Sequence, residues 1–114
     1  MDISDPMHDL YTGHLNPTQQ KVANEIMSVV RTYTGGLYTG GCKAFYTPKQ
    51  WEDRGEQFGL YSILIVCHDG GDFAPFFDWG IEADSWRNVM NARLKNLGFY
   101  AEQCTSWYTS IYPV

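Results

Sequence analysis

The sequence predicts an α+β fold, with a small mixed or antiparallel sheet of three to five strands packed by two main amphipathic helices. Residues 17–33 and 83–97 each repeat apolar side chains at helical spacing, and residues 60–67 hold the longest apolar run. The 114 residues are the size of one domain. We expect this domain over residues 16–114, preceded by an irregular N-terminal arm at residues 1–15.

The first helix is predicted from its start signal. Asn16 can cap it, Pro17 fits the first helical position, and Gln19 completes a capping-box pattern. Gly35 follows the last apolar position and is expected to end the helix. The apolar face comprises Val22, Ile26, Val29, Val30 and Tyr33.

Two further helices follow the same logic. Thr47, Pro48 and Gln50 repeat the start signal, so a short helix is expected over residues 48–54, after a strand over residues 42–47. Asp78 or Asp84 is expected to cap the helix over residues 83–97. Its predicted apolar face comprises Trp86, Val89, Met90, Leu94 and Leu97, while Arg87, Asn91 and Lys95 are expected to lie elsewhere.

The centre of the chain is predicted to be a strand over residues 60–67. Its last five residues, Ile63 to Cys67, are apolar without alternation, which is typical of a strand covered on both faces. The run is too short to favour a helix, and β-branched residues dominate it. We expect this strand to form the centre of the core.

The five residues after this strand, His68 to Asp72, have two interpretations. Glycines at positions 70 and 71 are typical of a tight turn, and residues 73–77 would then be a returning edge strand that tolerates Pro75. Alternatively, one imidazole and two carboxylates beyond the end of a buried strand are suited to a ligand site.

The second interpretation leads to a small metal-dependent hydrolase or ligand-binding enzyme. Asp69 and Asp72 would bind a divalent metal, with His68 as a further ligand or a catalytic base. Asp78 or Glu82 would be the remaining ligand of the metal. The segment matches no specific metal or phosphate motif. Under the turn interpretation, no cofactor is expected.

The C-terminal segment, residues 99–112, is predicted to be a strand. This strand is either continuous or broken near Thr105 and Ser106. It is rich in tyrosine, and a long aromatic strand at the edge of a sheet is suited to pairing with another protein. The candidate contact residues are Tyr100, Trp107, Tyr108 and Tyr112. Tyr38 is a further candidate from outside this segment.

Composition narrows the function classes. The net charge of −5 argues against nucleic-acid binding, which draws its affinity largely from Lys and Arg. The three cysteines form no CxxC pair, which favours a reducing, cytoplasmic location. From the acidic N-terminal segment and the lack of a long apolar stretch, we expect no signal peptide and no membrane span.

These observations favour a binding function over catalysis. The chain is small and acidic, it lacks a specific catalytic motif, and aromatic residues make up 16% of it. Tyr and Trp are enriched at protein interfaces and among their energetically dominant residues. We therefore expect a protein-binding module of the inhibitor or accessory-subunit type whose partner is another protein, with a homodimer as the alternative.

Overall fold

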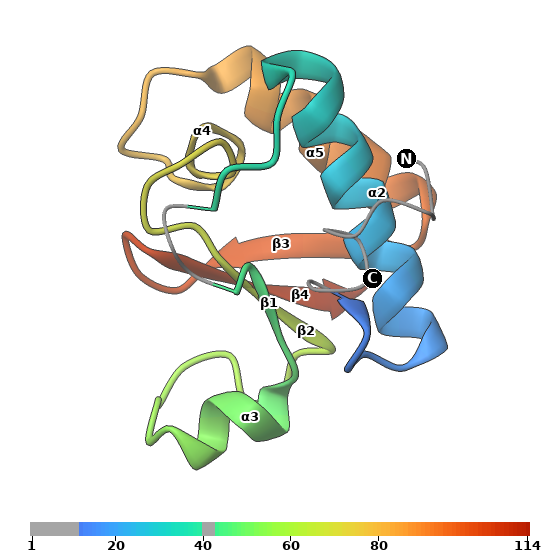
Figure 1. Cartoon of the computed structure of the whole chain (residues 1–114), viewed down its shortest axis with the longest axis vertical. Coiled ribbons are helices and arrows are strands. Elements are labelled where there is room, and N and C mark those ends of the chain that lie inside the picture. The colour runs from blue at the N-terminus through green and yellow to red at the C-terminus, as the bar shows by residue number, and fades with distance from the viewer. Residues whose placement is uncertain (1–11, 40–42) are drawn as a thin grey trace.

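The computed structural model describes residues 12–39 and 43–114 (Figure 1). Within them, four helices and a four-stranded antiparallel sheet form an α+β domain, as the sequence predicts. In chain order the elements are α2 (Pro17–Thr34), β1 (Phe45–Tyr46), α3 (Pro48–Asp53), β2 (Leu64–Cys67), α4 (Ala74–Phe77), α5 (Asp84–Asn96), β3 (Phe99–Gln103) and β4 (Tyr108–Pro113).

The strand order in the sheet is β1-β2-β4-β3, and each neighbouring pair is antiparallel. Strand β4 lies between β2 and β3, so the last two strands form a hairpin and β2 does not pair with β3. The segment 99–112 is thus two strands, and the break between them lies near Thr105 and Ser106, where the sequence analysis allowed for one. The Oγ1 atom of Thr105 accepts hydrogen bonds from the backbone N–H groups of Trp107 and Tyr108 in this turn.

Helix α2 begins and ends where its sequence signals lie. The Asn16 side chain accepts a hydrogen bond from the Gln19 backbone, and the Gln19 side chain accepts one from the Asn16 backbone, which completes the capping box. Gly35 adopts the left-handed conformation (φ +80°) that ends a helix without a Cβ penalty. Thr47 and Gln50 form the same reciprocal bonds at the start of α3.

The sheet separates two hydrophobic clusters. Helices α2, α4 and α5 cover one face, whereas α3 lies on the opposite side of the sheet (Figure 1). Leu64 and Val66 of β2 belong to the larger cluster, while Ile65 packs with Trp51 and Tyr108 in the smaller one. All four β2 residues are buried, so the prediction of a strand covered on both faces is confirmed.

Two boundaries in the centre of the chain differ from the prediction. Strand β2 starts at Leu64 because residues 60–63 form a turn, in which the Ser62 hydroxyl donates to the Gly59 carbonyl over 2.6 Å. Residues 74–77 form the helix α4 instead of a returning strand. Pro75 lies in the first turn of that helix, where its missing N–H is not needed.

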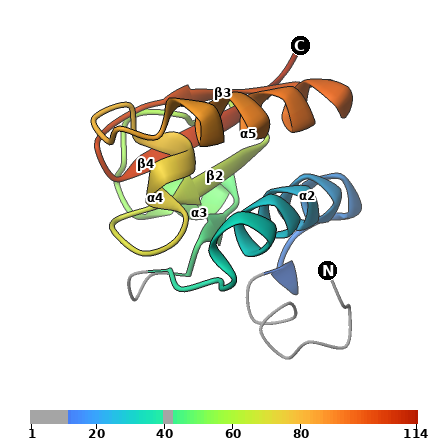
Figure 2. The same cartoon turned by 90° about the horizontal axis from the view of Figure 1, so that it is seen from above.

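Helix α5 confirms the predicted element and its apolar face at Trp86, Val89, Met90 and Leu94, which lie in or against the larger cluster, but not its predicted N-cap. Its N-cap is Ala83, which makes no side-chain capping bond, so neither Asp78 nor Asp84 caps it. The buried residues are Arg87, Met90 and Leu94. Arg87 therefore lies on the core side. Figure 2 shows α4 beside the first turns of α5, and α2 crossing the same side of the sheet.

Of the predicted N-terminal arm, residues 1–11, including His8, lie outside the described residues. Thr12 and Leu15 are buried, and the Nε2 atom of His14 lies 3.0 Å from the carbonyl oxygen of Phe45. Residues 12–15 thus pack against the domain. None of the helices in the described ranges is long and apolar enough to span a bilayer.

Candidate functional site

His68 follows β2 and is buried beneath α4. Its Nε2 atom lies 2.8 Å from the Oγ1 atom of Thr109 on the neighbouring strand, and its ring stacks on Phe77 with centroids 5.6 Å apart. Only 1% of the residue is exposed, and its Nδ1 atom has no hydrogen-bond partner. The imidazole is therefore part of the packing between the sheet and α4.

Burial also determines the protonation state of His68. Removal from water lowers its pKa from 6.5 to about 4, because the charged imidazolium loses its hydration. The ring is consequently neutral at neutral pH. A buried base with so low a pKa is poorly matched to proton transfer near pH 7, where catalytic groups operate best with a pKa close to the ambient pH.

The two carboxylates of the segment take separate positions. Asp72 forms a bridge to Tyr38, because its Oδ2 accepts from the Tyr38 N–H over 2.8 Å and its own N–H donates to the Tyr38 carbonyl over 2.7 Å. Asp69 is exposed. Gly70 and Gly71 have φ angles of 82° and 75°, which glycine adopts readily. The segment thus forms a turn that joins β2 to α4 and fixes the loop after α2.

The residues proposed to complete a metal shell are also dispersed. Asp78 accepts hydrogen bonds from the Gly80 N–H over 2.8 Å and the Gln103 side chain over 3.1 Å, and the Gly80 bond is the main cause of its lowered pKa. Glu82 is exposed. Among residues 12–39 and 43–114, no group of three His, Cys, Asp or Glu side chains is placed to hold a metal ion. The arrangement favours the turn interpretation.

Arg87 is a residue whose role the sequence prediction missed. Its Nη1 donates to the carbonyl oxygens of Asp78 over 2.9 Å and Ile81 over 2.6 Å, and its Nη2 contacts the Asp84 carboxylate. Its guanidinium lies 4.8 Å from the Trp79 ring centroid. The side chain thus holds the connection from α4 to α5. Arg87 precedes Met90 by three residues and Leu94 by seven. This helical spacing indicated that Arg87 lies on the same buried face as these two residues.

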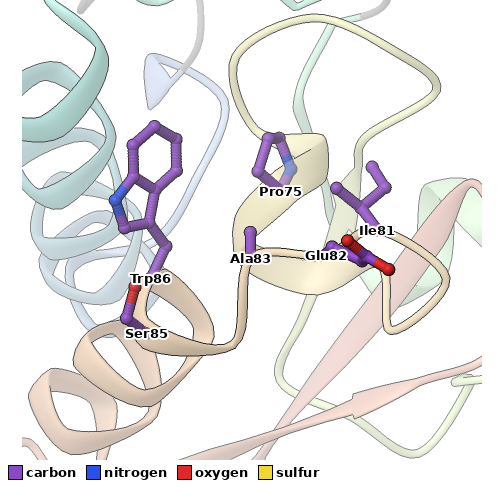
Figure 3. Close-up of a pocket in the computed structure, with 6 residues that line it drawn as sticks. All are labelled: Pro75, Ile81, Glu82, Ala83, Ser85 and Trp86. Atoms are coloured by element: carbon purple, nitrogen blue, oxygen red, sulfur yellow. The ribbon is translucent and has the colours of Figure 1, made fainter.

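A pocket of about 320 Å³ opens between α4 and the start of α5 (Figure 3). Its lining residues are Pro75, Ile81, Glu82, Ala83, Ser85 and Trp86. The Trp86 ring stacks on Phe76, with centroids 5.0 Å apart, and forms a rigid wall. Glu82 is the ionisable side chain of the lining. The pocket can receive an apolar group, and the Ser85 and Glu82 side chains lie apart on opposite sides of it in Figure 3.

The C-terminal aromatic residues divide into exposed and buried members. Tyr100 and Tyr112 lie opposite each other on β3 and β4 and stack with ring centroids 5.5 Å apart, and 46% of Tyr100 is exposed. Trp107 is half-buried and its ring packs against Trp51. Tyr108 is 1% exposed, so it supports the smaller cluster and offers no contact surface. Tyr38 is exposed beside the turn at Asp72.

The outer edge of β3 is open. Bonds from the Cys104 N–H to the Tyr108 carbonyl and from the Val114 N–H to the Gly98 carbonyl flank the hairpin ladder. Because hydrogen-bonded pairs alternate in an antiparallel ladder, Tyr100 and Glu102 direct their backbone groups toward β4. The backbone groups of Phe99, Ala101 and Gln103 therefore point away from the sheet. The structure assigns no strand to this side of β3 within the described residues.

Comparisons of the chain with models of protein families, with curated proteins and with solved structures give no match.

Proposed function

We propose that the protein is a binding module, of the inhibitor or accessory-subunit type, that receives an extended segment of a partner protein along the open edge of β3. The observation that supports this most directly is the combination of outward backbone groups on β3 with the stacked Tyr100–Tyr112 pair beside them. An added strand would gain main-chain hydrogen bonds from the edge and aromatic contact from the pair.

The aromatic pair is suited to this role by its rigidity. Tyr100 and Tyr112 are already stacked, so contact with a partner orders little additional side-chain freedom. Trp107 extends the aromatic surface at the other end of the hairpin, where it lines a pocket of about 320 Å³ with Phe58. We propose Tyr100, Tyr112 and Trp107 as contact residues, supported from below by Tyr108.

The proposal also includes the cellular location of the protein, which we infer from its cysteines. Cys67 and Cys104 are both thiols, and one of them is buried in the central strand. Cysteine thiols in a small domain are typical of reducing compartments. We therefore propose a cytoplasmic protein.

The test is a selection of random peptides on the immobilised protein, followed by affinity measurements on purified variants. Ala101→Pro removes an outward N–H and leaves the ladder to β4 intact, while Ala101→Ser keeps the N–H at similar size and is the matched control. We expect selected peptides to bind the wild type and Ala101→Ser but not Ala101→Pro. Tyr100→Ala and Trp107→Ala should each weaken binding by about 2 kcal/mol if they act as anchors.

Equal binding by Ala101→Pro and Ala101→Ser would contradict strand addition. A selection that enriches no peptide dependent on β3 would contradict the proposed function as a whole.

A further inference from the structure

A groove runs along the open edge of β3, on the side of the sheet that α5 covers. Asn91 and Lys95 of α5 form one wall, and Phe99, Tyr100 and Ala101 of β3 form the other, with Val114 at the end. Its volume is about 290 Å³, and most of its lining is apolar. The groove lies where alternate side chains of a strand added to β3 would point.

The charged side chain of this groove, Lys95, is opposite in sign to the net charge of the protein. Lys95 contributes an ammonium group, none of the other side chains in the lining is ionised at neutral pH, and the net charge of the chain is −5. Lys95 is exposed, and within the described ranges it takes part in none of the ion pairs, whereas Arg93 on the same helix pairs with Glu25. Lys95 is therefore a cation available to a carboxylate from outside.

We infer that the segment bound by β3 carries an acidic side chain directed at Lys95 and an apolar side chain seated against Phe99 and Ala101. This inference rests on the proposed function. Residues opposite each other in an antiparallel pair point to the same face, so every second residue of the added strand enters the groove. The residues between them contact the Tyr100–Tyr112 side.

The same geometry argues against a second copy of this chain as the occupant. In a pairing of β3 with β3 of another copy, the residues that enter the groove would be Phe99, Ala101 and Gln103. None of them is acidic, so Lys95 would gain no carboxylate. Glu102, the acidic residue of β3, would lie on the opposite face beside the tyrosines.

The test uses three fluorescein-labelled peptides of alternating sequence, Thr-Val-Thr-X-Thr-Val-Thr, in which X is Glu, Gln or Lys. Binding is followed by fluorescence anisotropy and by shifts of the β3 amide signals in NMR spectra. On the wild type, we expect the Glu peptide to bind about tenfold more tightly than the Lys peptide. Lys95→Glu should reverse that order.

Lys49→Glu is the matched control, because Lys49 lies on α3, across the sheet, and the substitution changes the net charge equally. We expect it to preserve the preference for the Glu peptide. If the Glu and Lys peptides bind the wild type equally, or if both substitutions act alike, the inference is overturned. Loss of all binding in Ala101→Pro would in that case still support strand addition.

Two other outcomes also overturn the inference. A wild-type dimer in sedimentation that Ala101→Pro dissociates would give the edge to a second copy. Binding of the Glu peptide without any shift of the Phe99, Ala101 or Gln103 amides would place the peptide elsewhere.

Discussion

The Nε2 atom of His68 lies 2.8 Å from the Oγ1 atom of Thr109, across the two central strands of the sheet. The imidazole on one side of this contact is buried and has a pKa lowered to about 4, because burial removes the hydration of its charged form. Protonation in the folded state is therefore opposed by the packing of β2, β4 and α4 around the ring. We therefore expect the stability of the fold to depend on the protonation of His68.

We expect the free energy of unfolding to fall as the pH decreases from 6.5 to about 4. The unfolded chain, with a histidine pKa of 6.5, takes up the proton before the folded one does. The contribution of His68 is thus fully present above pH 6.5 and is lost as the pH falls through the folded pKa, by about 3 kcal/mol in total. Urea denaturation across this pH range measures it.

His68→Gln should flatten most of this dependence, because glutamine does not titrate. His14→Gln is the comparison, since partial burial also lowers the pKa of His14 but the side chain remains partly exposed. If the wild type and His68→Gln lose stability equally between neutral pH and pH 4, the packing account of His68 is wrong.

Arg87 should be the most sensitive polar position in α5. Arg87→Leu removes the donors to the Asp78 and Ile81 carbonyls and leaves the loop between α4 and α5 without its anchor. We expect a loss of about 3 kcal/mol in the free energy of unfolding, since the side chain is buried and makes several bonds to backbone acceptors. Chemical denaturation monitored by Trp fluorescence would report it.

We expect the hydrogen-bond geometry of Arg87, and not its charge alone, to stabilise the loop. Arg87→Lys keeps the charge but loses the planar fork, so it should recover only a small part of the loss. Asp84→Ala, which removes the exposed partner of the ion pair, should cost less than about 1 kcal/mol. A larger effect for Asp84→Ala than for Arg87→Lys would show that the ion pair dominates.

The elements that the sequence predicted best are those with local signals. The capping boxes at Asn16 and Thr47 and the positive-φ glycine at residue 35 lie within a few residues of the helix ends that they determine. The unbroken apolar run at 63–67 likewise indicated a strand covered on both faces. In each case the physical cause is contained in the segment itself.

The features that the sequence did not show depend on distant partners. Arg87 is buried because backbone carbonyls surround it, and a carbonyl acceptor carries no sequence signature. The position of β4 between β2 and β3 follows from pairing between segments more than forty residues apart, such as Leu64 with Ile111. Pro75 was compatible with both an edge strand and a first helical turn, and contacts of α4 with His68 and α5 decided between them.

The open edge of β3 can be tested without any partner. Amide groups of Tyr100 and Glu102 bond to β4, whereas those of Ala101 and Gln103 point away from the sheet. In hydrogen–deuterium exchange, we expect the first two amides to be protected and the last two to exchange faster. Tyr100→Pro should destabilise the fold strongly, while Ala101→Pro should change its stability little. Equal protection of all four amides would mean that the edge is covered.

The glycines of the loop between α3 and β2 offer a matched pair that tests how this loop covers the sheet. Gly55 and Gly59 both have left-handed φ angles, +88° and +81°. A Cβ added at Gly59 would lie 2.9 Å from the Ile65 Cδ1 and 3.0 Å from the Ser110 Cβ, whereas one at Gly55 would meet nothing within 4 Å. Gly59→Ala therefore combines backbone strain with a clash against β2 and β4, and Gly55→Ala has the strain alone.

We expect Gly55→Ala to cost about 1 kcal/mol and Gly59→Ala about 1–3 kcal/mol more, as measured by thermal and urea denaturation. Similar losses for the two variants would show that the loop moves away from the sheet readily, and that the smaller hydrophobic cluster around Trp51 does not depend on its close approach.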